Sequence, residues 1–184
     1  MFTRTRARPS TADRGEPLPI FLDVEASSLD LGKSYPTEVA WSLPDGGIRC
    51  HLVRPAPTWD DWSPRAEQLT GISRHRIEAS GRPVREVALA MNRDLARRTV
   101  YCDGGIHDRF WVRRLFNTAG VPCHFDLAPV EALSWHQYCA LLPPAEVESV
   151  RLQARLDAGP AHRADRDVDF LLRFYRALAE RASR

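Results

Sequence analysis

The sequence predicts one α/β domain, because short apolar runs typical of strands alternate with longer stretches of helical periodicity. The chain has 184 residues, which is long enough to bury one hydrophobic core. Its first apolar run, Leu18-Pro19-Ile20-Phe21-Leu22, leads directly into Asp23-Val24-Glu25. Together these observations predict the α/β class and indicate that acidic functional groups lie at the end of the first strand.

Five segments are typical of strands. Residues 19–24 form a continuous apolar run, and residues 38–43 and 48–53 flank Pro44-Asp45-Gly46-Gly47, whose composition favours a hairpin turn. Two further strands are expected at residues 100–102 and 121–127.

Four segments have helical signals. Ser63-Pro64 predicts the start of a helix and Thr70-Gly71 its end. Apolar residues recur at helical spacing over residues 83–98, 108–118 and 163–182. Residues 140–148 carry no clear pattern.

Asp23 and Glu25 are separated by one residue, so both side chains are expected on the same face of the first strand. Two convergent acids are costly in a hydrophobic core, but they supply the hard oxygen ligands that Mg²⁺ and Mn²⁺ prefer. The pair therefore indicates a cation site at the end of this strand.

Asp108 and Asp167 each lie at the N-terminal end of the apolar stripe of a predicted helix. Taken singly, each is also explained by helix capping, where aspartate is favoured. Together with Asp23 and Glu25, they favour a metal site, because four converging carboxylates repel one another unless cations hold them.

His162 follows the Gly159-Pro160 break and precedes Asp167 by five residues. A lone histidine is more often an ordinary surface or core residue. At a loop–helix junction beside a candidate metal ligand, we interpret it as a general base toward water.

The order of these motifs resembles the DnaQ-like 3′–5′ exonucleases of the DEDDh type. Asp23-Val24-Glu25-Ala26-Ser27-Ser28-Leu29 is similar to the family's first motif, and Glu38-Val39-Ala40 is similar to its second-strand segment. Ala66-Glu67-Gln68-Leu69-Thr70-Gly71-Ile72-Ser73 resembles its helix-and-turn segment. The second and third motifs are matched by Gly104-Gly105-Ile106-His107-Asp108 and His162-Arg163-Ala164-Asp165-Arg166-Asp167. The sister subfamily has tyrosine where this chain has Arg163, so the histidine favours the DEDDh type.

The resemblance implies a ribonuclease H-like three-layer fold with a mixed, roughly five-stranded sheet flanked by helices. It also implies 3′–5′ hydrolysis of single-stranded DNA or RNA with two Mg²⁺ or Mn²⁺ ions about 4 Å apart. The ligands would be Asp23, Glu25, Asp108 and Asp167, with Asp23 bridging the ions and His162 as the general base.

The same resemblance implies that Ala26, Ser28 and Leu29 contact the 3′-terminal nucleotide. Core packing is an equal alternative for Leu29. Ala26 and Ser28 depart from the family's usual threonine and glycine, which places substrate choice in question. Asp103 is a further acid near the second motif, but a turn residue is an equal interpretation and we assign it no ligand role.

Composition sets the remaining expectations. The net charge of +2 resides in residues 1–17, an arginine-rich segment expected to be a disordered tail before one domain at 18–184. The four cysteines form no CxxC pair, and no apolar segment is long enough to cross a bilayer. We expect a cytoplasmic protein that binds single-stranded 3′ ends. The sequence leaves open whether the protein forms a homodimer or binds a polymerase or repair partner. The alternative function is a non-catalytic module that binds nucleic acid or protein.

Overall fold

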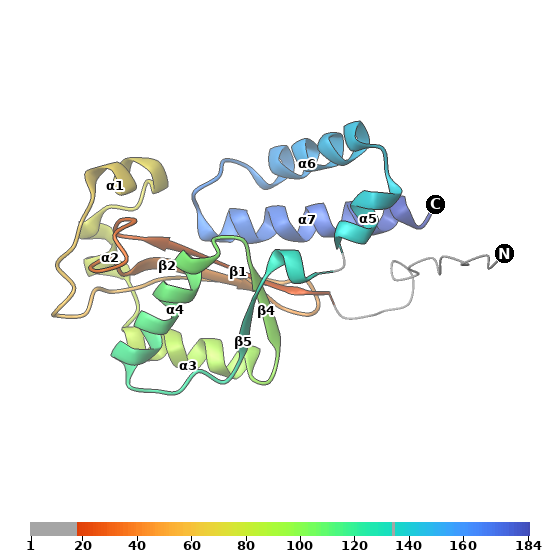
Figure 1. Ribbon diagram of the computed structural model, residues 1–184. Helices are drawn as coiled ribbons and strands as arrows, with labels where there is room; N and C mark the ends of the chain where they lie inside the picture. The colour runs from red at the N-terminus through yellow and green to blue at the C-terminus, as the bar shows by residue number, and fades with distance from the viewer. Residues whose placement is uncertain (1–17, 134) are drawn as a thin grey trace.

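A mixed five-stranded sheet forms the centre of the computed structural model (Figure 1). The strand order is β3-β2-β1-β4-β5, with antiparallel pairing of β1 with β2 and β2 with β3, and parallel pairing of β1 with β4 and β4 with β5. The predicted α/β class and mixed sheet are therefore confirmed. The strands are β1 (Ile20–Ala26), β2 (Pro36–Ser42), β3 (Ile48–Leu52), β4 (Thr99–Cys102) and β5 (Asp126–Pro129).

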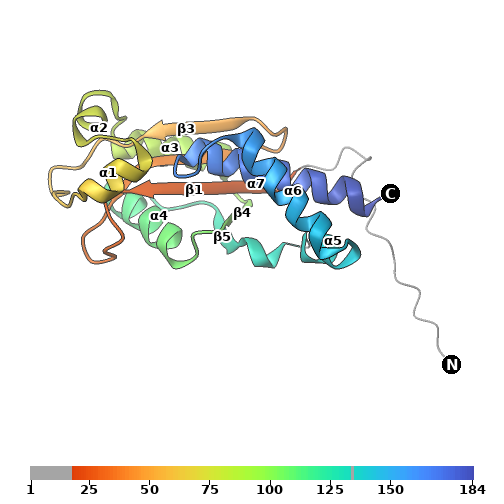
Figure 2. The same cartoon turned by 90° about the horizontal axis from the view of Figure 1, so that it is seen from above.

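Helices cover both faces of the sheet and give the three expected layers (Figures 1 and 2). Helix α7 packs on one face with α6 and α5 beside it, while α3 and α4 pack on the other. Helices α1 and α2 lie at one end of the sheet. The helices are α1 (Pro64–Thr70), α2 (Arg74–Ser80), α3 (Val84–Leu95), α4 (Ile106–Ala119), α5 (Trp135–Leu141), α6 (Pro144–Ala158) and α7 (Ala164–Ala182).

The structure describes residues 18–133 and 135–184, so the expected tail at residues 1–17 lies outside the described residues. Among the described residues, none of the helices combines the length and the apolar character needed to span a membrane.

Alternation along β1 decides which face carries the two acids. Leu22 and Val24 belong to the core that α3 and α4 cover, whereas Phe21 packs with residues of α7. Because successive side chains of a strand point to opposite faces, Asp23 and Glu25 lie on the same face as Phe21. The two acids therefore face the layer that contains α7.

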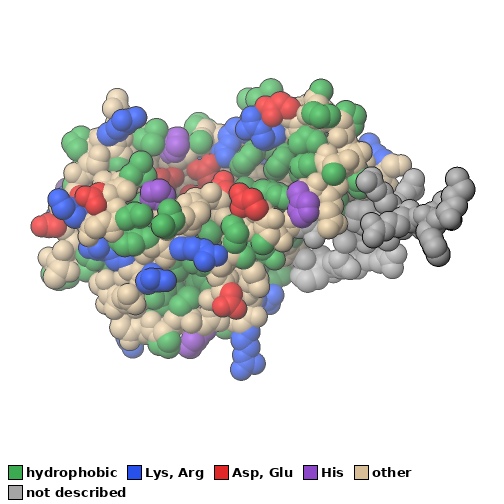
Figure 3. All heavy atoms as spheres, viewed as in Figure 1, with side chains coloured by type: hydrophobic (Ala, Val, Ile, Leu, Met, Phe, Trp, Pro, Cys, Tyr) green, Lys and Arg blue, Asp and Glu red, His purple; other side chains and the backbone are tan. Residues whose placement is uncertain are grey.

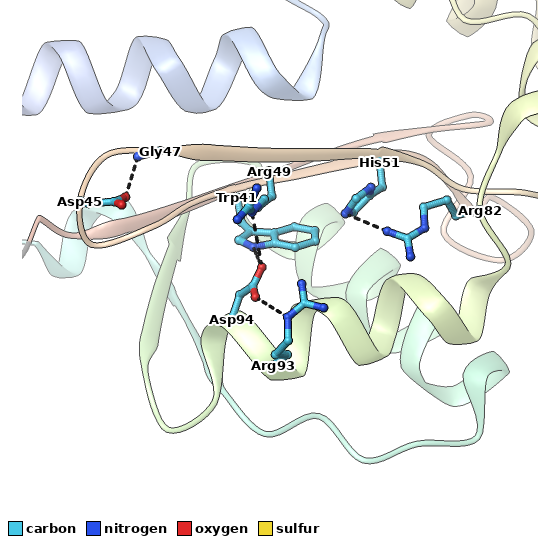
Figure 4. Close-up of polar contacts among 8 residues, drawn as sticks. All are labelled: Trp41, Asp45, Gly47, Arg49, His51, Arg82, Arg93 and Asp94. Atoms are coloured by element: carbon cyan, nitrogen blue, oxygen red, sulfur yellow. Dashed lines mark hydrogen bonds and ion pairs between the residues drawn. The ribbon is translucent and has the colours of Figure 1, made fainter.

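The predicted hairpin joins β2 to β3 (Figure 4). Asp45 Oδ1 accepts a hydrogen bond from the Gly47 N–H at 2.9 Å, and Gly46 has a φ of +87° that favours glycine. Nearby, the Trp41 indole donates to Asp94 Oδ2 of α3 at 3.2 Å, which ties the hairpin to the helical layer.

Three sequence expectations differ from the structure. The last strand occupies 126–129 rather than 121–127, because Asn92 of α3 binds the preceding loop: it donates to the Pro122 carbonyl and accepts from the His124 N–H. Helices α2 and α5 have no counterpart among the segments predicted from the sequence. Helix α6 lacked a clear pattern because it packs on α7 and buries little more than Val150 and Ala154.

Candidate metal centre and adjoining pocket

Three carboxylates from two elements form the first part of the site. Asp23 and Glu25 project from β1, and Asp167 lies in the first turn of α7. One oxygen from each carboxylate lies within 4.8 Å of the others. The packing of α7 on the sheet thus brings together acids that are more than 140 positions apart in the chain.

Asp23 also belongs to a second group, with Asp103 and Asp108, whose ligand atoms again lie within 4.8 Å of one another. Asp103 follows directly after β4, the parallel neighbour of β1, and Asp108 lies in the first turn of α4. The structure therefore places the other three sequence-predicted acids, Glu25, Asp108 and Asp167, around Asp23. It adds Asp103, whose only sequence signal is its place immediately after a strand.

The pKa values of the acids reflect their crowding. Burial, followed by the charges of Asp108, Glu25 and Asp167, raises the pKa of Asp23 well above its ordinary value. Burial and the charge of Asp167 raise the pKa of Glu25 to about 7, and burial and Asp103 raise that of Asp108 to about 7. A fully ionised cluster is therefore unfavourable by itself, and this all-oxygen donor set fits hard divalent cations.

The backbone at the helix starts orients the two helical acids. Asp108 Oδ2 accepts from the Gly104 N–H at 2.9 Å, and Asp167 Oδ2 accepts from the N–H groups of His162 and Arg163 at 2.8 and 3.2 Å. Neither acid is the N-cap of its helix, because Gly105 and Arg163 hold those positions. Each carboxylate instead reaches back to N–H groups at or just before the helix start while it also belongs to the cluster. A Cβ on Gly104 would lie 2.5 Å from Asp108 Oδ2, so this close approach requires glycine.

His162 occupies the loop between α6 and α7 with a φ of +67°. Its side chain is exposed, and within the described parts of the chain its imidazole has no hydrogen-bond partner. The ring is therefore accessible to water, while the backbone N–H of the same residue donates to Asp167, one of the clustered acids.

A buried ion pair anchors the start of α7. Glu38 of β2 is 1 % exposed and accepts from Arg163 Nη2 and Nε at 2.7 and 3.0 Å, and from the Ala164 N–H at 3.0 Å. Glu38 also pairs across the sheet with Glu25. Arg163 therefore turns toward Glu38 and holds the turn that carries both His162 and Asp167, a role the sequence pattern does not reveal.

A pocket of about 410 Å³ opens beside Glu25. Leu29 is 75 % exposed at its rim, so the core-packing alternative for this residue is wrong. The loop that carries Leu29 is held by Ser27, which donates to Asp61 and accepts from the Tyr35 N–H. The lining comprises Glu25, Ala26, Ser28 and Leu29 together with Ser63, Arg65, Ala66, Leu69, Thr70 and Trp111.

Figure 3 shows the surface around the site. Acidic side chains gather in a hollow between the end of the molecule that carries α1 and the layer of α6 and α7, with histidine side chains near its rim. Asp23, Glu25 and Asp167 are each only partly buried, so this group of carboxylates is accessible from solvent.

Comparisons with known proteins support the fold assignment. No protein-family model matches the sequence, and no curated protein matches it. The solved structures that resemble it share its class of fold, a ribonuclease H-like three-layer fold with the mixed sheet and flanking helices described above.

Several of the similar solved structures are of exonuclease I. A complex of the Escherichia coli protein with a dA16 oligonucleotide has a TM-score of 0.64 at 15% identity, covering 89% of this chain and 42% of that one. A zinc-bound E. coli complex with single-stranded DNA gives 0.62 at 17% identity, covering 89% and 41%. The protein from Methylocaldum szegediense gives 0.53 at 16% identity, covering 68% and 30%. The chain thus spans about two-fifths of the length of the E. coli structures.

The raised pKa values predict a metal-dependent change of stability with pH. Glu25 and Asp108 bind protons more tightly in the folded state, so without metal the free energy of unfolding falls as the pH rises from about 4 through about 7. The loss is expected to be on the order of 3 kcal/mol for each of the two groups. Thermal unfolding in EDTA should give a higher Tm at pH 5.5 than at pH 8, and Mn²⁺ should raise the Tm most at pH 8.

Another group contributes with the opposite sign, so a matched variant is needed. Burial and the charge of Arg82 lower the pKa of His51, whose protonation therefore destabilises the fold as the pH falls (Figure 4). The comparison is between the wild-type protein and the Glu25→Gln, Asp108→Asn double variant. An equal pH dependence in the two proteins would contradict the prediction.

Proposed function

We propose that this protein is a metal-dependent 3′–5′ exonuclease that releases nucleotides from single-stranded DNA or RNA. The observation that carries the proposal is the pair of acidic groups that share Asp23, next to a pocket rimmed by the exposed Leu29. The resemblance in fold to exonuclease I structures that contain single-stranded oligonucleotides supports the same substrate class.

Each part of the site has a role in this proposal. Divalent cations held by Asp23, Glu25, Asp108 and Asp167 would neutralise phosphate charge and lower the pKa of the attacking water. Asp103, which lies beside Asp23 and Asp108, would help these two acids to hold a cation. The exposed imidazole of His162 accepts the proton of the attacking water, which a carboxylate engaged with a cation does poorly.

The pocket is proposed to bind the terminal nucleotide. Leu29 and Leu69 are 75 % and 55 % exposed and offer apolar contact to a base, while Ser28 and Arg65 offer polar contacts to the sugar and phosphate. A base that covers the two leucines removes their apolar surface from water, which stabilises the complex.

The test of the proposal is release of mononucleotides from matched 3′-labelled single-stranded DNA and RNA, with Mg²⁺, Mn²⁺ or EDTA. We expect metal-dependent release that is lost in Glu25→Ala and in His162→Ala. Glu180→Gln, an exposed acid of α7 far along the helix from the site, is the matched control and should retain activity. Activity in EDTA, or full activity of Glu25→Ala, would overturn the proposal.

A non-catalytic binding module is distinguished in the same experiment. A folded protein that binds Mn²⁺ and oligonucleotide but releases no nucleotide would favour the module. The relative rates on DNA and RNA also identify the preferred sugar.

Leu29→Ala should weaken binding of the terminal nucleotide more than it slows hydrolysis. Loss of the apolar contact with the base is expected to raise KM by about tenfold, which corresponds to roughly 1–2 kcal/mol. Because Leu29 is exposed, the variant should unfold at the wild-type temperature. Steady-state kinetics on a 3′-labelled oligonucleotide, with Leu141→Ala as an exposed-leucine control, tests this. A fall in kcat with no change in KM would contradict the assigned contact.

A further inference from the structure

Arg155 of α6 reaches into the candidate metal centre. Its Nη2 lies 2.7 Å from Asp167 Oδ1, and its guanidinium stacks over the ring of Phe170 at 4.0 Å. The two charged side chains are 28% and 16% exposed, so water screens their interaction only in part. A cation is therefore fixed beside one of the carboxylates that would hold the metal.

The pair is not needed to orient the carboxylate. Asp167 Oδ2 is already held by two backbone N–H groups, those of His162 and Arg163. Moreover, the other terminal nitrogen of Arg155, Nη1, is buried and has no hydrogen-bond partner within the described residues. An unpartnered buried donor costs free energy, so the placement of Arg155 is poorly explained by stability alone.

The electrostatic consequence is direct. A guanidinium stays charged at every physiological pH, and the stacking on Phe170 keeps it near Asp167 even when that carboxylate is engaged elsewhere. A fixed positive charge near a ligand reduces the negative potential that attracts a divalent cation.

We propose that Arg155 sets the metal affinity of the site by acting as an internal counter-ion to Asp167. It reduces the repulsion within the empty carboxylate cluster, and it competes with the divalent cation for Asp167. This inference rests on the proposed metal-dependent function and concerns binding of the metal rather than the hydrolytic step itself.

The test is calorimetric titration of the protein with Mn²⁺ in the absence of nucleic acid. Arg155→Met keeps the aliphatic stem on Phe170 but removes the charge, and we expect it to bind Mn²⁺ about tenfold more tightly than the wild-type protein. Arg155→Lys should restore much of the wild-type affinity. Arg151→Met, on an exposed arginine of α6 paired with Glu148, is the control and should leave the affinity unchanged.

A double-variant cycle identifies the partner. In an Asp167→Asn background, Arg155→Met should change the Mn²⁺ affinity by less than about threefold, because the paired charge is gone. Wild-type or weaker Mn²⁺ binding by folded Arg155→Met would overturn the proposal. If the wild-type protein and Arg155→Met both failed to bind Mn²⁺, the metal centre itself would be refuted, and the counter-ion role with it.

Discussion

Asp23→Asn is expected to abolish nucleotide release while making the metal-free protein more stable. Asp23 is the one acid that belongs to both carboxylate groups, so its loss affects both candidate cation positions. Removing charge stabilisation worth several kcal/mol from the transition state lowers the rate by on the order of 10³-fold or more.

The gain in stability has a separate physical cause. The pKa of Asp23 is raised by its burial and by the neighbouring carboxylates, so ionisation of this residue opposes folding when no metal is present. Asparagine keeps the size of the side chain without the charge. Each kcal/mol of repulsion removed should raise the Tm by roughly 2–4 °C.

Paired measurements separate these effects. Thermal unfolding is followed in EDTA and in Mn²⁺, and nucleotide release is measured on the same preparations. Asp157→Asn, an exposed acid of α6, is the control for removal of one negative charge and should change neither quantity. A destabilised Asp23→Asn protein, or one with wild-type activity, would contradict the arrangement described for this site.

Glu38→Ala is expected to produce the largest loss of stability. Glu38 is almost fully buried and binds both the guanidinium of Arg163 and the Ala164 N–H. Removing it leaves the partly buried Arg163 without its acceptor, and breaking such a pair costs up to about 3–5 kcal/mol. Activity should also fall, because Arg163 holds the turn that carries His162 and Asp167.

Urea unfolding in EDTA measures the first effect. The Glu38→Met, Arg163→Met double variant should be more stable than Glu38→Ala, because neither charge is then left buried alone. Its activity should stay low if the pair positions His162 and Asp167. A loss below about 1 kcal/mol for Glu38→Ala would show that the pair is only a weak surface contact.

Local features of the sequence determine much of this protein. Residues 20–26 alternate between two faces, so the placement of Asp23 and Glu25 on one face follows from strand geometry alone. The hairpin turn and the start of α1 are equally local: Asp45 binds the turn backbone, and the Ser63 side chain accepts from the Ala66 N–H. Signals of this kind depend only on residues a few positions away in the chain, and for that reason they can be predicted from the sequence.

Other features were decided only by the tertiary structure. Helix α6 has a weak apolar pattern because its partner is another helix rather than the sheet, and Asn92 binds the loop that displaces β5. Asp103 joins Asp23 because β4 pairs in parallel beside β1. None of these contacts leaves a periodic signal, because each joins segments distant in the chain.

The same distinction applies to the charges at the site. The sequence by itself determined which acids lie at strand and helix ends, since those positions follow from backbone period. Only the tertiary structure decided that Arg163 pairs with Glu38 and Arg155 with Asp167. Ion pairs form between whichever side chains the packed elements bring within a few ångströms, and that choice is made by the fold as a whole.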